Sequence, residues 1–96
     1  MKIQYYCIRD IKSNTFNRPF GGLTVEQVKR SIYASIVQGN SEIAQFPEDF
    51  ELYLVGEFDD KTGVITGQTP AMICNIREIV TQYTLRKAAK EASDNE

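Results

Sequence analysis

Two segments of this chain alternate their side chains as β-strands do, and each carries apolar groups on both faces. They span residues 3–11 and 50–58. Successive side chains of a strand point to opposite faces, so a sheet built from these segments must be at least partly covered on both sides. In the first segment, Ile3, Tyr5 and Cys7 lie on one face, and Tyr6 and Ile8 lie on the other.

A helix is predicted between these strands, beginning after Thr24 and ending at Gly39-Asn40. Thr24 with Gln27 fits a capping box, in which side chains satisfy the free N–H groups of the first turn. Gly39 suits the left-handed conformation that ends many helices. An apolar stripe at helical spacing runs through Val25, Val28, Ile32 and Ile36.

Turn-forming residues delimit the other extended segments. Lys12-Ser13-Asn14 predicts a turn, and an extended segment over residues 15–20 follows it until Gly21-Gly22. The stretch from Asp59 to Gly63 predicts a hairpin turn, with Gly63 in a left-handed position. Residues 64–66 then return as a short antiparallel strand.

The last third of the chain fits two structures. Thr69-Pro70 is typical of a helix N-cap followed by proline in the first helical position, and apolar groups recur at helical spacing beyond it. We therefore predict a helix over residues 70–91. Residues 79–84 also fit a strand, because β-branched and aromatic side chains are frequent there. Residues 93–96 are predicted to be a disordered tail.

Together these segments predict a single α+β domain over residues 1–92. A small antiparallel sheet of three to four strands carries one packed helix, and a C-terminal helix follows. The second sheet face is covered either by that C-terminal helix or by another subunit, which would make the protein a homodimer. The chain has 96 residues, so its core is modest and a second subunit would add burial.

The chain contains no histidine, which excludes the catalytic mechanisms that depend on this residue. Its absence removes Ser-His-Asp and Cys-His nucleophile activation, and the usual general base near neutral pH. Cys7 and Cys74 form no CxxC pair, so they predict no zinc site and are expected to be reduced, small apolar residues. We therefore expect a protein that is not an enzyme, with no cofactor, no catalytic residue and no metal ligand.

The sequence gives no sign of a membrane protein. No stretch approaches the roughly 18 apolar residues that a membrane helix requires. The first residues lack the apolar segment and the cleavage site of a secretory signal. We expect the protein to remain in the cytoplasm of the cell that makes it.

Charge is unevenly distributed along a chain whose net charge is −2. Residues 1–30 hold six basic and two acidic side chains, whereas residues 31–76 hold one basic and seven acidic. Basic residues interleaved with aromatic ones fit single-stranded nucleic-acid binding, because cations follow the phosphates and rings stack on bases. The candidate residues are Arg9, Lys12, Phe16, Arg18, Phe20, Lys29 and Arg30.

Structural interpretations compete with these functional ones. Phe16 and Phe20 also fit core positions of a small domain, and Lys29 and Arg30 fit a solvated helix face. Asp59-Asp60 fits a turn, because the ligand spacing of a calcium-binding loop is missing. The basic residues of the last third are mixed with glutamates and fit a solvated helix surface; they are Arg77, Arg86, Lys87 and Lys90.

Two stretches resemble the small nonstructural protein of gokushoviruses, single-stranded DNA phages of the Microviridae. The first runs from Ile8-Arg9-Asp10-Ile11-Lys12 through Phe16 to Arg18-Pro19-Phe20. The second begins at Pro47-Glu48-Asp49-Phe50-Glu51-Leu52 and ends in the Asp59–Gly63 turn. The resemblance covers about residues 3–66, and the C-terminal third departs from it.

The resemblance implies a nonstructural, DNA-binding protein of the host cell cytoplasm that acts when replication switches to making single-stranded genomes. Its expected partners are single-stranded DNA or the phage and host proteins of the replication complex. The family it resembles has no established catalytic residue. The alternative is a protein-interaction adaptor that uses the acidic segment 50–60 and does not contact nucleic acid.

Overall fold

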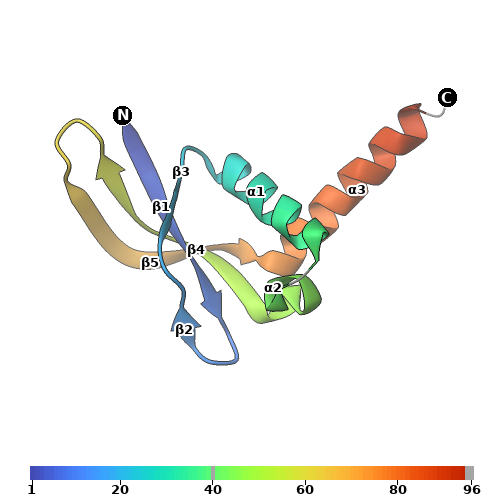
Figure 1. The fold of residues 1–96 in the computed structure, drawn as a ribbon, viewed down its shortest axis with the longest axis horizontal. Coiled ribbons are helices and arrows are strands. Elements are labelled where there is room, and N and C mark those ends of the chain that lie inside the picture. The colour runs from blue at the N-terminus through green and yellow to red at the C-terminus, as the bar shows by residue number, and fades with distance from the viewer. Residues whose placement is uncertain (40, 95–96) are drawn as a thin grey trace.

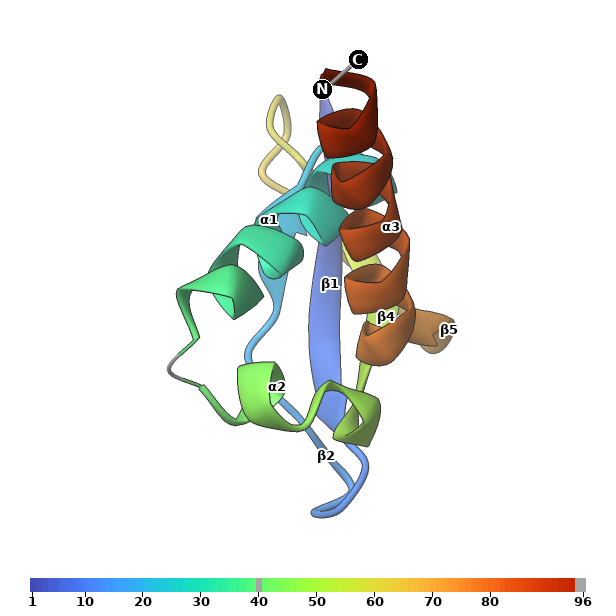
Figure 2. The same ribbon diagram turned by 90° about the vertical axis from the view of Figure 1, so that its right-hand side faces the viewer.

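The computed structural model describes residues 1–39 and 41–94, and it consists of a curled antiparallel sheet with helices on one side (Figure 1). Figure 2 shows the same arrangement with the helices towards the viewer and the sheet behind them. The predicted α+β class is confirmed. The elements are β1 (Lys2–Asp10), β2 (Thr15–Phe16), β3 (Phe20–Gly22), α1 (Val25–Gln38), α2 (Glu42–Gln45), a 3-10 turn (Pro47–Asp49), β4 (Phe50–Asp59), β5 (Ile65–Asn75) and α3 (Ile76–Asp94).

The sheet has the strand order β2-β1-β4-β5, and β3 pairs with β1 beside β2. It has five strands because the extended segment after the first turn forms two short strands instead of one. β1 and β4 run antiparallel through the centre of the sheet. Val55 is an extra residue of β4 opposite the step from Tyr5 to Tyr6, which makes a β-bulge. The predicted hairpin turn between β4 and β5 is confirmed, with Gly63 at φ +76°.

One face of the sheet packs against α1 and the start of α3 to form the core. Leu52, Ile76 and Ile79 are completely enclosed. Burying one side chain of this size contributes roughly 1.5–3 kcal/mol, so this cluster is the main source of stability. Its buried members are Tyr6, Ile8, Val28, Ile32, Phe50, Leu52, Cys74, Ile76 and Ile79.

Helix α1 forms where the sequence predicts it. The Thr24 hydroxyl accepts a hydrogen bond from the backbone N–H of Gln27 at 3.1 Å, and the Gln27 side chain accepts one from the N–H of Leu23 at 3.1 Å. Gly39 ends the helix with φ +86°. Both ends of the helix are therefore encoded in local sequence.

The glycine pair before α1, where the extended segment is predicted to end, is itself part of the sheet. Gly21 and Gly22 belong to β3, where they pair with Tyr5 and Gln4 of β1. A Cβ at Gly22 would collide with the side chain of Val28. The missing side chain therefore lets α1 lie directly against β3.

The C-terminal third differs most from the prediction. β5 extends to Asn75, so α3 begins at Ile76 and not at residue 70. Pro70 lies in a stretch of β5, residues 68–70, that has no partner in the β4 register. Proline is tolerated there because no ladder hydrogen bond is lost.

Helix α3 begins at a side-chain cap. The side-chain oxygen of Asn75 accepts a hydrogen bond from the backbone N–H of Arg77 at 2.8 Å. The helix continues through residues 79–84, so the strand interpretation of that stretch is wrong. It also includes Ser93 and Asp94, so the first half of the predicted tail is helical, and residues 95 and 96 lie outside the described part.

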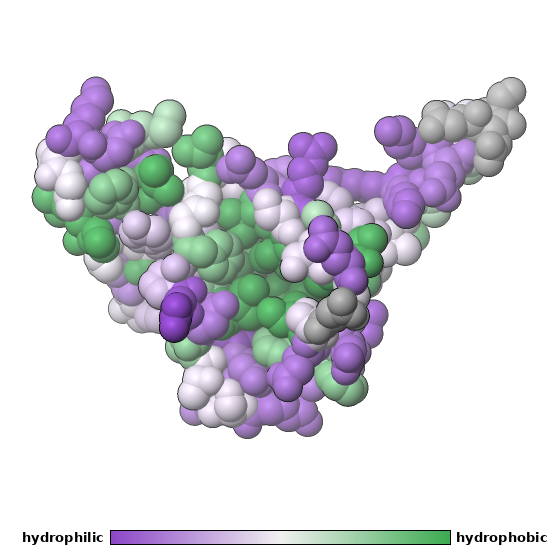
Figure 3. Space-filling view, in the orientation of Figure 1, coloured by the Kyte–Doolittle hydropathy of each residue, from purple (hydrophilic) through white to green (hydrophobic). Residues whose placement is uncertain are grey.

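The molecule is elongated, with principal extents of 51 × 33 × 21 Å. Its Cα radius of gyration is 15.2 Å, compared with about 12.5 Å for a compact chain of this length. One arm is the β4–β5 hairpin, and the other is the free end of α3 (Figure 1). Figure 3 shows a hydrophilic α3 arm, whereas the hairpin arm carries hydrophobic surface. None of the described helices is long and apolar enough to cross a membrane.

Candidate functional site

The sheet face turned away from the helices carries apolar and aromatic side chains of its own. The register pairs Cys7 with Tyr53, and Tyr53 with Met72. In the described part of the chain, the helices lie on the other side of the sheet (Figures 1 and 2). α3 therefore does not cover this second face. We call it the open face and define it by Ile3, Tyr5, Cys7, Arg9, Phe16, Glu51, Tyr53, Phe58 and Met72.

Two aromatic pairs lie on the open face. Phe16 meets Tyr53 edge to face, with ring centroids 5.1 Å apart and planes inclined by 78°. Tyr5 and Phe58 lie 6.4 Å apart at a smaller tilt. Phe16 is 44% exposed, although its ring is as large as those in the core. The face therefore presents aromatic surface that solvent or a ligand can reach.

Arg9 crosses the same face, but its charge is already compensated. Its guanidinium lies 2.9 Å from the Glu51 carboxylate and also donates to the side chain of Asn14. The Tyr53 hydroxyl donates to the same carboxylate at 3.3 Å. The ion pair joins β1 to β4. Because Arg9 is paired and only 24% exposed, little of its charge is left for a phosphate.

The remaining basic candidates of the N-terminal segment are accessible. Lys12 is exposed in the turn between β1 and β2, and Arg18 is exposed between β2 and β3. Within residues 1–39 and 41–94, neither side chain forms an ion pair. Together with Phe16 they make a small basic and aromatic edge beside the open face.

The other three candidates lie elsewhere. Phe20 packs against the core, with its ring 6.1 Å from that of Tyr6, so the core interpretation applies to it. Lys29 and Arg30 are on α1, which covers the opposite face of the sheet. The structure therefore does not bring all seven candidates to one surface.

Most carboxylates of the acidic segment have partners within the chain. Glu57 lies 3.5 Å from the Lys2 amine, and Asp60 lies 2.7 Å from the N-terminal amine. Asp59 accepts a hydrogen bond from the backbone N–H of Lys61 at 2.9 Å, as expected of a turn residue. Among the described residues, no three Cys, Asp or Glu side chains converge on a metal site.

Cys7 and Cys74 are free and buried, in line with the prediction for them. Burial raises the pKa of each thiol, because a thiolate loses its hydration there. Both thiols are therefore less nucleophilic than an exposed cysteine at neutral pH.

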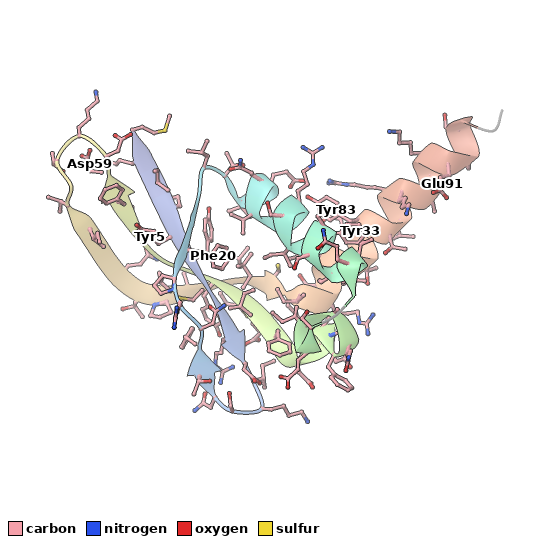
Figure 4. The ribbon with its side chains drawn as sticks, viewed as in Figure 1. Tyr5, Phe20, Tyr33, Asp59, Tyr83 and Glu91 are labelled. Atoms are coloured by element: carbon pink, nitrogen blue, oxygen red, sulfur yellow. The ribbon has the colours of Figure 1, made fainter. Side chains whose placement is uncertain are left out.

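A groove between α1 and α3 was not predicted from the sequence. It has a volume of about 540 Å³, and Tyr33 and Tyr83 stack on each other in it with ring centroids 5.4 Å apart (Figure 4). We call it the α1–α3 groove. Its lining includes Arg30, Tyr33, Tyr83, Arg86, Lys87 and Lys90.

Glu26 links the two helices at this groove. Its carboxylate accepts hydrogen bonds from the Tyr83 hydroxyl at 2.6 Å and from the Arg86 guanidinium at 2.8 Å. The Tyr83 hydrogen bond and then Arg86 lower the pKa of Glu26, and the same contact raises the pKa of Tyr83. The guanidinium of Arg86 also lies 4.9 Å from the centre of the Tyr83 ring. In the sequence, this cluster is indicated by the spacing of Arg86 and Lys87, which follow Tyr83 by three and four residues and so share one face of α3.

The family model described as Phage ORF5 protein matches residues 3–79 of this chain. The chain belongs to the Phage ORF5 protein family. This ORF5-family protein is thus a phage accessory protein, in agreement with the phage origin that the sequence resemblance implies. The ORF5 match spans the sheet, α1 and the first turn of α3, and it ends before Tyr83. Neither the search of curated proteins nor the search of solved structures finds a match.

Proposed function

We propose that this phage accessory protein binds single-stranded DNA through the open face and its basic edge, and that it serves genome replication in the host cytoplasm. The observation that carries this proposal is the aromatic surface at Phe16, which stands edge-on to Tyr53 and is uncovered. Bases stack on such rings whatever their sequence, at about 1–3 kcal/mol per base. Lys12 and Arg18 are exposed beside it and would meet the phosphates.

The charge balance sets the expected strength of binding. The chain carries a net charge of −2, and Arg9 is engaged by Glu51. Affinity should therefore be moderate and should fall with salt, because few phosphates are neutralised. The resemblance to the gokushovirus nonstructural protein supports a role in making single-stranded genomes, either directly on DNA or within the replication complex. We propose a binding protein and not an enzyme.

Fluorescence anisotropy with a labelled single strand of about 30 nucleotides tests the proposal. Phe16→Leu keeps an apolar side chain against Tyr53 but removes the stacking ring. We expect it to weaken binding roughly 5- to 150-fold, which corresponds to the stacking energy of one base. Lys12→Gln with Arg18→Gln should also weaken binding and flatten its salt dependence, whereas Lys61→Gln in the distant hairpin turn should not. Wild-type protein that fails to bind even at low salt would refute the proposal.

A protein-interaction adaptor is the second candidate, and the hairpin arm favours it. Val64 and Ile65 at its tip are 56% and 65% exposed, although both are apolar. The acidic segment is a weaker docking site than its sequence suggests, since Glu51, Glu57 and Asp60 are paired within the chain. A phage or host replication protein, or a second copy of this chain, would contact the arm.

The adaptor is tested by pull-down from infected cells and by light scattering. A protein partner that survives nuclease treatment, and is lost in Val64→Ser with Ile65→Ser, would favour the adaptor. A strictly monomeric protein that loses every partner after nuclease treatment would exclude both the adaptor and the homodimer.

A further inference from the structure

The α1–α3 groove collects positive charge in a chain that is acidic overall. Four cationic side chains line it, from both helices, against the single carboxylate of Glu26. That carboxylate already accepts hydrogen bonds from Tyr83 and Arg86. The local excess of positive charge is therefore not compensated inside the groove.

Arg30 shows how this excess arises. It lies four residues after Glu26 in α1, the spacing at which a glutamate and an arginine pair along one helix face. Arg86 of α3 takes that carboxylate instead, at 2.8 Å. Among the side chains that the structure describes, neither Arg30 nor Lys87 forms an ion pair.

The groove also offers ring surface beside these cations. Tyr33 and Tyr83 stack there (Figure 4), with planes inclined by 25°. The guanidinium of Arg86 lies over the Tyr83 ring. An acidic peptide would use only the cations. A nucleotide chain would use both features, since its phosphates meet Arg and Lys while its bases lie against rings.

We propose that the α1–α3 groove is a second contact for single-stranded nucleic acid, which binds the phosphate backbone of a segment that the open face does not hold. This inference rests on the proposed function, because it takes the same ligand. The groove lies on the helix side of the sheet, opposite the open face. A bound strand must therefore pass from one side of the protein to the other, or two strands must bind.

The groove residues of α3 lie beyond the part of the chain that matches the Phage ORF5 family. The match ends at residue 79, before Tyr83, Arg86, Lys87 and Lys90. The α1 side of the groove, with Arg30 and Tyr33, lies within the matched region, as does the whole open face.

The test measures the fluorescence anisotropy of a labelled single strand with two variants, each of which lacks two lysines. Lys87→Gln with Lys90→Gln removes two charges from exposed positions of α3, and Lys2→Gln with Lys61→Gln removes two from the far end of the molecule. We expect the groove variant to bind a 30-nucleotide single strand roughly 20-fold more weakly near 0.1 M salt. Its salt slope should be shallower by about 1.4, the value for two lost phosphate contacts on a single strand. Unchanged circular dichroism and urea midpoints confirm that the fold is intact.

The outcomes separate the groove from the open face. Wild-type affinity in the groove variant, with weak binding in Phe16→Leu, would overturn the groove and leave the proposed function standing. An equal loss in the Lys2 and Lys61 variant would assign the effect to net charge and would also overturn the groove. If a polyglutamate peptide of equal charge competes as well as DNA, the groove binds an acidic protein segment, and the nucleic-acid proposal for the groove is overturned. Absence of any wild-type binding would overturn both proposals.

Discussion

At the scale of single residues, Gly56 and Gly67 face each other across β4 and β5, yet only one of them has space for a side chain. A Cβ at Gly56 would lie 2.5 Å from the backbone oxygen of Thr66, whereas a Cβ at Gly67 would have nothing within 4 Å. Backbone atoms cannot rotate away as a side chain can. The close approach of the two strands beside the bulge therefore depends on Gly56 alone.

We predict that Gly56→Ala destabilises the protein by about 2–3 kcal/mol, because the added methyl group must push the two strands apart. Gly67→Ala should be neutral or stabilising by up to about 1 kcal/mol, since alanine loses less backbone entropy on folding. Urea unfolding of both variants measures the difference. Similar midpoints for the two would show that the strands are farther apart than in this structure.

Glu26 gives the protein an acid-sensitive link between α1 and α3. Its pKa is lower in the folded state, because Tyr83 and Arg86 donate to its carboxylate. The ionised form therefore stabilises the fold above the usual glutamate pKa of about 4.3, and this contribution disappears as the pH falls through the lowered folded value.

We expect Glu26→Gln to be less stable than wild type at pH 7, and this difference to shrink as the pH is lowered below about 4. Urea midpoints of both proteins across this range measure it. A difference that stays constant with pH would mean that the ionised carboxylate contributes nothing beyond a neutral hydrogen-bond acceptor.

The sequence identifies the types of residue at the candidate site better than their surroundings. Phe16 and Phe20 are both aromatic and four residues apart, but Phe16 lies on the open face and Phe20 packs at the core. Which face each ring occupies depends on the pairing of β2 and β3 with β1. Likewise, the Arg9 partner Glu51 is 42 residues away, so its neutralisation cannot be read from the local pattern.

At the scale of elements, α3 consists of two unlike halves. Its first two turns contribute Ile76 and Ile79 to the core. From residue 84 to residue 93 every side chain is exposed. An isolated helix of this length is marginal in water, so the second half receives stability only from the first half and from the contacts at the groove.

We predict that hydrogen exchange divides α3 near Tyr83, with slow amides before it and fast amides after it. Proline substitutions should show the same boundary. Ala89→Pro should cost about 1 kcal/mol or less, whereas Thr81→Pro, in the packed half, should cost about 3 kcal/mol or more. Uniform protection along the helix would show that another surface covers its free end.

The start of α3 shows why local signals were only partly sufficient. Thr69-Pro70 has the form of a helix start, but Asn75 with Glu78 three residues later has it too, and the second is the one used. The choice is made by pairing, because Leu52 opposite Cys74 buries both side chains in the core. By contrast, α1 has its cap, stripe and terminal glycine within one short segment, and the sequence predicts it correctly.

At the scale of the whole molecule, the two arms make the protein larger than its mass suggests. We predict that small-angle scattering at low concentration gives a radius of gyration of at least 15 Å, the Cα value of the extended form. A value near 12.5 Å, as for a compact chain of this length, would mean that α3 folds back onto the body. The forward scattering of the same sample gives the mass, and a doubled mass would support the homodimer.

The interruption of β5 at residues 68–70 affects how the protein behaves when it is crowded. β5 is an edge strand of eleven residues, and such an edge is a template on which copies of a protein can join into fibres. Pro70 removes one backbone donor from this edge, and the unpaired stretch around it breaks the regular spacing of the others. We therefore expect the same feature that hides the start of α3 in the sequence to protect the protein from aggregation.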